Sequence, residues 1–205
     1  MSRTAPVVTG QRGRLVNVES KEFFEVAVAA LLAEDLALRL LLKGRLSHGD
    51  YQPGLGTAYE TGAVYTVFKA LLASPFSKKW NVDWEDRHGV GHKRIDLTYH
   101  RHHMGLDARV GVEVKWWSKG GYGIVDDCRK LLAAPGLSHR YVLVLRAWNP
   151  GRSEQALSFL LDRLLKGRRC SQLCVEREQY YEAEVLSWFG EPGKLGFALV
   201  QTWDG

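Results

Sequence analysis

The chain has few cysteines and no long hydrophobic run that is free of charge. Its 205 residues include three cysteines, Cys128, Cys170 and Cys174. So small and odd a set predicts no disulfide framework, and a reducing compartment is the expected setting. The most hydrophobic stretch, residues 26–42, is interrupted by Glu34, Asp35 and Arg39. Those charges favour an amphipathic helix over a membrane span.

Other absences narrow the class of protein further. Residues 1–20 have neither the apolar core nor the cleavage pattern of a signal peptide, so we expect a cytoplasmic location. There is no internal repeat and no low-complexity segment. A composition of 45% hydrophobic and 25% charged residues is typical of a globular protein with a real core, here a single domain. The net charge of +5 permits an acidic polymer as partner without requiring one.

The pattern of apolar residues predicts an α/β architecture with a mixed central sheet flanked by helices. After a tail over residues 1–18, helices are predicted at about 19–44 with Ser20 as N-cap, 57–73, 125–133, 153–166 and 179–188. Strands are predicted at 80–86, around Asp96, around Glu113, at 141–145 and at 196–202. The short turns among the first three strands predict an antiparallel meander. A helix then leads to a further buried strand, which makes a layered α/β fold.

Two of these strands combine a buried face with a charged one. Residues 94–98 and 112–116 alternate apolar and polar side chains, so Ile95 and Leu97 are expected to share one face. The opposite faces carry Asp96, Glu113 and Lys115. If the strands pair, two carboxylates and one ammonium group converge. Such a site suits a hard divalent cation with a cationic group beside it, as phosphodiester hydrolysis needs.

The triplet Glu113-Val114-Lys115 means little alone, because Glu19-Ser20-Lys21 repeats its pattern at a helix start. The triplet is more significant because it is in phase with Asp96 on the preceding strand and because Glu60 lies on the preceding helix. Glu60 shares a predicted helix stripe with Val64, Val67 and Leu71, where a carboxylate needs a metal or a cation as compensation. Alternatively, Glu60 lies in the first turn, where the helix dipole favours an acid that reaches water.

Glu60, Asp96 and Glu113-Val114-Lys115, in the order helix, strand, strand, resemble the PD-(D/E)XK nucleases, the restriction-endonuclease-like superfamily. The resemblance covers roughly residues 57–146 and implies an α-β-β-β-α-β core with an extra N-terminal helix. The segment 126–131 is similar to the acid-x-x-Lys-Leu stretch that many members carry on the following helix. Ile95 stands where the family name has proline, as is often the case in members.

The resemblance implies an endonuclease that hydrolyses phosphodiester bonds in DNA with water activated by a metal. Asp96, Glu113 and the Val114 carbonyl would bind Mg²⁺, for which Mn²⁺ can substitute. Glu60 would complete the acidic cluster, and Lys115 would orient or deprotonate the attacking water. Many members act as dimers, so a homodimer or larger complex is a possible assembly. The alternative is a catalytically inactive nuclease-like fold that serves as a nucleic-acid-binding or assembly subunit.

Contacts with the nucleic acid are predicted for residues around these strands. Lys93, Arg94, Thr98 and Lys119 are expected beside the phosphates. Trp117 is in phase with Glu113 and Lys115, so it either stacks on a base or packs beneath a loop.

Overall fold

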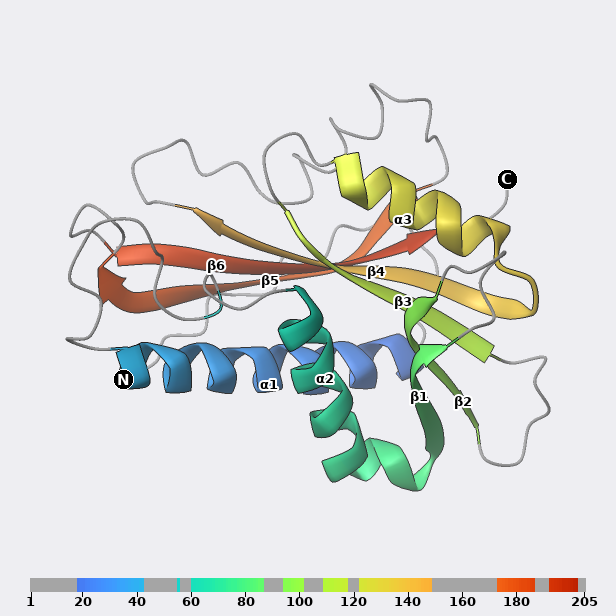
Figure 1. Ribbon diagram of the computed structural model, residues 1–205, viewed down its shortest axis with the longest axis horizontal. Helices are drawn as coiled ribbons and strands as arrows, with labels where there is room; N and C mark the ends of the chain where they lie inside the picture. Colours follow the sequence, from blue (N-terminus) through green and yellow to red (C-terminus); the bar gives the residue numbers. More distant parts are fainter. Residues whose placement is uncertain are drawn as a thin grey trace.

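The described residues form a six-stranded mixed sheet with helices on both faces (Figure 1). The computed structural model describes residues 18–42, 55, 60–86, 94–101, 109–117, 122–148, 173–186 and 192–202. The helices are α1 (Val18–Leu42), α2 (Glu60–Ala73), the short 3₁₀ helix η2 (Pro75–Lys78) and α3 (Tyr122–Ala133). The strands are β1 (Trp80–Asp86), β2 (Ile95–Arg101), β3 (Arg109–Trp116), β4 (Leu137–Trp148), β5 (Leu173–Leu186) and β6 (Pro192–Thr202).

The strands are arranged in the sheet as β1-β2-β3-β4-β6-β5. β1, β2 and β3 form an antiparallel meander, and β4 runs parallel to β3 after the α3 crossover. β6 pairs antiparallel with both β4 and β5. The predicted α/β class, the mixed sheet, the meander and the N-terminal helix are therefore confirmed. The helix predicted at 153–166 lies outside the described residues.

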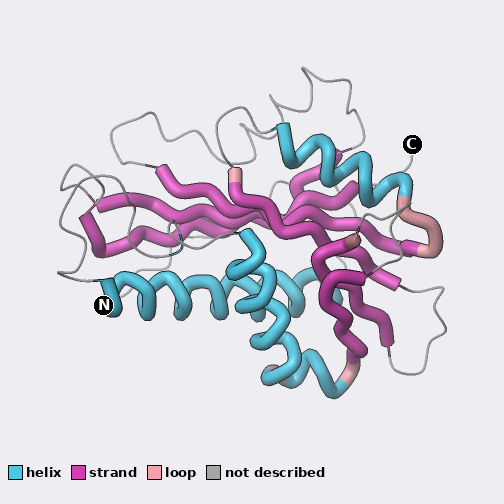
Figure 2. Tube along the Cα trace, in the orientation of Figure 1, coloured by secondary structure: helices cyan, strands magenta, loops and turns pink. Residues whose placement is uncertain are grey.

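The sheet separates two hydrophobic clusters. α1 and α2 cover one face and α3 covers the other (Figures 1 and 2). On β4, Leu143 and Leu145 pack on the α1/α2 side, while Val142 and Val144 pack on the α3 side. This strand is buried on both faces, as its continuous apolar run predicts.

Two predicted elements are wrong in type or position. Residues 179–186 form part of strand β5 rather than a helix, because β5 pairs with β6 along its length and this pairing outweighs local propensity. α1 begins at Val18, so Ser20 lies inside the helix, fully buried, and is not its N-cap.

A buried acid explains one interruption of the hydrophobic stretch in α1. Asp35 is 2% exposed and pairs with Arg39 at 2.5 Å, one helical turn away. It also accepts the Leu55 backbone N–H at 2.8 Å, which attaches that residue to the helix. Among the described helices, none is both long and apolar enough to cross a membrane.

Candidate functional site

The pairing between β2 and β3 ends where the acidic residues begin. The last paired residues are Leu97 and Val112, so the next opposing positions are Asp96 and Glu113. At this point, which we call the fork, Val114 donates its backbone N–H to Asp96 Oδ2 at 2.8 Å. The carboxylate thus replaces a strand carbonyl as acceptor. The structure brings Asp96 and Glu113 together, as the strand phase predicts.

The strand phase fails at one residue beside the fork. Leu97 packs on the α1/α2 side of the sheet, but Ile95 packs on the α3 side, so the prediction that they share a face is wrong. The pairing of β2 with β3 ends at Leu97, so Ile95 lies beyond the part of the strand that this pairing holds. The neighbouring strand is also irregular here. β1 pairs Trp84 with Leu97 and Asp86 with Ile95, while the intervening Glu85 has a φ of 52°. This left-handed residue interrupts regular alternation at the edge of the sheet.

Glu113 is the most buried acid of the site. It is 2% exposed, and its Oε2 lies 2.6 Å from Lys130 Nζ. No N–H or O–H donor among the described residues reaches its Oε1, and the Glu113 carboxyl is in hydrogen-bonding contact with the Asp96 carboxyl. Burial, and then the negative charge of Asp96, raise the pKa of Glu113 to about 8. A buried oxygen without a partner is costly unless a cation binds it, so Glu113 is suited to cation binding.

Two neighbouring carboxyls are perturbed in the same direction. Burial raises the pKa of Asp96, opposed by the Val114 N–H and by Lys130. Burial also raises the pKa of Asp127 on α3, opposed mainly by Lys115. Several raised carboxyl pKa values in one place are typical of functional sites.

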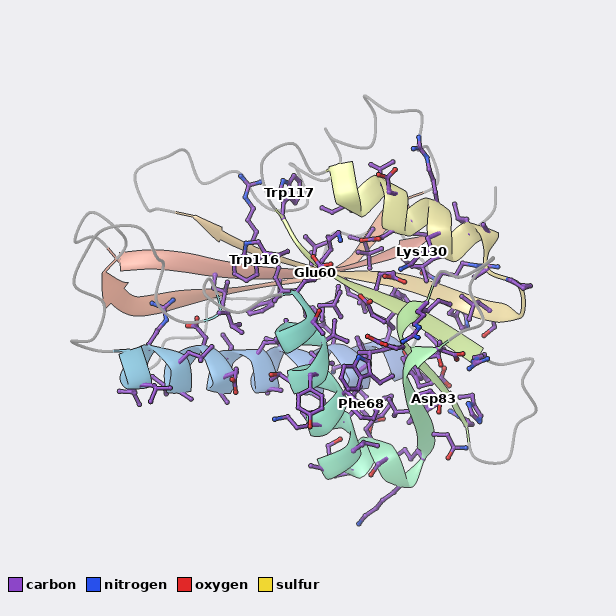
Figure 3. The ribbon with its side chains drawn as sticks, viewed as in Figure 1. Glu60, Phe68, Asp83, Trp116, Trp117 and Lys130 are labelled. Carbon is purple, nitrogen blue, oxygen red and sulfur yellow. The ribbon has the colours of Figure 1, made fainter. Side chains whose placement is uncertain are left out.

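Lys115 joins the two helices across the end of β3. Its Nζ lies 2.8 Å from Glu60 Oε1 and 3.2 Å from Asp127 Oδ2. Although burial alone would lower the pKa of Lys115, these carboxylates outweigh burial and raise it. Glu60 Oε2 also accepts the Trp116 N–H at 3.4 Å, and Figure 3 shows Glu60 at the end of α2 beside β3. Lys115 is therefore held as an ammonium group.

Glu60 is compensated by a cation and also lies in the first turn of α2 within reach of water, so both alternatives for it hold in part. Its predicted role as a metal ligand is not supported. Glu60 is the first residue of α2, its side chain is 40% exposed, and it pairs with a cation. Within the described parts of the chain, no three Asp, Glu, His or Cys side chains are placed to hold one metal ion. Asp96 and Glu113 are the acids that meet at the fork, and Glu60 pairs with Lys115 instead.

Sequence reasoning missed two residues of the site, Asp127 and Lys130. They are three residues apart on α3, so they project from the same side of the helix. Asp127 reaches Lys115 and Lys130 reaches Glu113, as the position of Lys130 in Figure 3 illustrates. The acid-x-x-Lys-Leu stretch pointed to this segment, but not to these partners.

The predicted phosphate contact of Thr98 is wrong. Thr98 is fully buried, donates its hydroxyl to Asp86 Oδ2 at 2.6 Å and accepts from Arg109 at 3.2 Å. Arg109 and Asp86 form a buried ion pair, so the Thr98 hydroxyl is already engaged and shielded from solvent. Arg94 is half-exposed and pairs with Glu85. Lys93 and Lys119 lie outside the described residues.

Trp117 packs against the α3 side of the core. It is partly buried beside the apolar cluster of that face, and the guanidinium of Arg146 lies 4.8 Å from its ring centroid. Its backbone N–H donates to the Leu145 carbonyl at 2.7 Å. The packing alternative therefore describes most of the indole, and base stacking stays a prediction.

Four carboxylates and two ammonium groups thus gather around the fork: Glu60, Asp96, Glu113, Asp127, Lys115 and Lys130, which we call the charged cluster. This arrangement can bind a divalent cation at the Asp96–Glu113 pair and present an ammonium group beside it. No family model, curated protein or solved structure matches this chain.

Proposed function

We propose that this protein is a Mg²⁺-dependent endonuclease of the PD-(D/E)XK type that hydrolyses phosphodiester bonds in DNA. The observation that carries the proposal is the Asp96–Glu113 pair at the fork, with a bare, buried Glu113 oxygen and Lys115 two residues further on. The element order α2-β1-β2-β3-α3-β4 supports the restriction-endonuclease-like core that the motif implies.

The residues at the fork fit a magnesium ion. Asp96, Glu113 and the backbone carbonyl of Val114 would hold it, all as oxygen ligands. Two carboxylates are enough, because Mg²⁺ usually keeps several of its waters. When bound, Mg²⁺ would stabilise negative charge on the phosphate and make water more acidic. The bare Oε1 of Glu113 and its raised pKa agree with this donor set.

The chain's own residues then perform distinct tasks. The Val114 N–H holds the Asp96 carboxylate in place. Lys115, kept protonated by Glu60 and Asp127, has one N–H left, with which it would orient the attacking water or a phosphate oxygen. Because two carboxylates hold Lys115 as an ammonium group, we assign it this orienting role.

Positive charge supplies affinity for the DNA backbone. The net charge of +5 and the half-exposed Arg94 favour phosphate contacts, to which Lys93 and Lys119 would add. Trp117 with Arg146 lies just beyond β3, where an aromatic ring could meet a base. DNA binding is therefore expected to weaken steeply as the salt concentration rises.

The direct test is a cleavage assay with the purified protein. Supercoiled plasmid, linear duplex, single-stranded DNA and RNA are incubated with Mg²⁺, with Mn²⁺ or with EDTA. We expect nicking or cutting of DNA with either metal and none in EDTA. Absence of cleavage of all four substrates with both metals would contradict the proposal.

A second function is favoured by the ion pairs themselves. Lysines already pair with Glu60, Asp127 and Glu113, so the charged cluster also resembles a self-satisfied structural network. This is the inactive nuclease-like subunit that binds nucleic acid or assembles with a partner. Such a protein would bind DNA with strong salt dependence but show no turnover with Mg²⁺.

Gly123 provides a test of how Lys115 is positioned. A Cβ added at Gly123 would lie 2.6 Å from Lys115 Cε, so Gly123→Ala must displace the lysine side chain. Alanine also favours the helix by about 1 kcal/mol. We therefore expect cleavage to fall about tenfold with no loss of stability, measured by initial rates and urea unfolding.

Gly62→Ala is the matched control, because Gly62 is an exposed glycine in the first turn of α2. It should gain helix stability and keep the wild-type cleavage rate. Equal rates for Gly123→Ala and the wild type would show that the position of Lys115 does not matter.

A further inference from the structure

Lys130 is the cation nearest to the acid that would hold the metal. Its Nζ lies 2.6 Å from Glu113 Oε2, and both side chains are well covered, at 17% and 2% exposed. Its charge also acts on Asp96 and Asp127, lowering the pKa of each against the effect of burial. Lys130 therefore compensates several acids of the charged cluster at once.

The charges of the cluster balance with a single divalent cation. Its four carboxylates and two ammonium groups leave two negative charges when all are ionised. One divalent cation neutralises them, whereas a second would leave an excess of two positive charges in a partly buried site. An uncompensated charge of that size is costly away from water.

The two carboxyl oxygens of Glu113 have different surroundings. Oε2 is held by Lys130, whereas no N–H or O–H donor among the described residues reaches Oε1, and the Glu113 carboxyl lies in hydrogen-bonding contact with the Asp96 carboxyl. When both acids are ionised, this contact needs a cation. Glu113 is 98% shielded from solvent, so its bare oxygen can be satisfied by a bound cation more readily than by bulk water. A second metal ion on Oε2 would have to displace the ammonium of Lys130.

We propose that Lys130 takes the place of a second metal ion, so that the site binds one divalent cation. The ammonium group neutralises one oxygen of Glu113 and the metal binds the other. This inference rests on the proposed metal-dependent function and specifies its metal stoichiometry. It also predicts what happens when Lys130 loses its charge.

Mn²⁺ binding measured by calorimetric titration in the absence of DNA tests the inference. The wild type should bind one Mn²⁺ per chain. Lys130→Met keeps an unbranched apolar side chain of similar reach but removes the charge, and should bind two. Lys130→Arg restores a cation and should return to one.

Arg129→Met is the matched control. Arg129 is the next residue on α3, its side chain is 63% exposed, and it pairs with Asp126 at the surface. Removing this charge should leave one Mn²⁺ per chain, because surface pairs of this kind contribute little. Circular dichroism confirms that each variant is folded.

Each outcome decides between the claims. Two Mn²⁺ per wild-type chain would overturn the role of Lys130 and leave the metal-dependent function intact. One ion of unchanged affinity in a folded Lys130→Met variant would also overturn it. If the wild type binds no Mn²⁺, the inference and the metal-dependent function both fail. If Lys130→Met does not fold, the wild type and Lys130→Arg still test the inference, because two Mn²⁺ bound to either would overturn it.

Discussion

Replacing Asp96 with asparagine is expected to reduce Mg²⁺-dependent DNA cleavage by at least about 10³-fold, because one of the two carboxylates proposed to bind the metal is lost. Asparagine keeps a carbonyl oxygen that can still accept the Val114 N–H. The backbone arrangement of β2 and β3 at the fork should therefore not change. Alanine would also leave that N–H without its acceptor. A lower cleavage rate could then come either from the lost hydrogen bond or from the lost carboxylate. Initial rates with plasmid DNA measure the effect.

The control for Asp96→Asn is Asp126→Asn. Asp126 is an acid on α3 whose side chain is 70% exposed and pairs with Arg129. It should retain the wild-type rate, while urea unfolding of both variants should match the wild type within about 1 kcal/mol. Cleavage at the wild-type rate by a folded Asp96→Asn protein would exclude the proposed mechanism.

Replacing Glu113 with glutamine is expected to stabilise the metal-free protein at pH 8. Burial, followed by the charge of Asp96, raises the pKa of Glu113 from 4.5 to about 8 in the folded state. The folded protein therefore binds this proton more tightly than the unfolded chain. Its contribution to stability is complete below about pH 4.5 and is lost as the pH rises through about 8.

Glutamine has no proton to lose, and its carbonyl can still accept a hydrogen bond from Lys130. In EDTA, the free energy of unfolding of the wild type should fall by up to about 1.4 kcal/mol per pH unit across this range. The variant should escape that loss, so its stability relative to the wild type should rise steadily between about pH 4.5 and pH 8. Urea unfolding at a series of pH values measures both curves.

Mg²⁺ should reverse the order of the two proteins. At pH 8, the metal should raise the melting temperature of the wild type, because it binds the folded state only. Glu113→Gln lacks the charged ligand and should gain little. Glu25→Gln, at an exposed pair with Lys21, is the control and should change nothing by more than about 0.5 kcal/mol. Parallel pH curves for wild type and Glu113→Gln would contradict the expected burial of a charge.

Much of the fold could be predicted because its signals are local. The run Tyr141-Val142-Leu143-Val144-Leu145 has no polar residue, and it forms the central strand β4, buried on both faces. β5 carried no such signal. Its 14 residues include four glutamates, and the segment becomes a strand because β6 pairs with it. Pairing between distant segments is not readable from local composition.

Part of the site could likewise be predicted from local signals, and part could not. Alternation along β2 and β3 predicted that Asp96 and Glu113 meet, and this depends only on strand phase. Thr98 shared that phase, yet it is engaged by Asp86 and Arg109, which lie more than ten residues away. The pairing of Lys130 with Glu113 depends on how α3 packs over the sheet. Contacts between side chains of different helices and strands could not be predicted from the sequence, because they depend on how those elements pack.

The two ion pairs of Lys115 have a consequence for how the chain matures during synthesis. Glu60 comes from a helix on one face of the sheet and Asp127 from a helix on the other. The ammonium group is held only after both helices have docked on a sheet whose parallel β3–β4 pairing is itself long-range. A nascent or misassembled chain therefore lacks the complete charged cluster, which confines its chemistry to correctly assembled molecules.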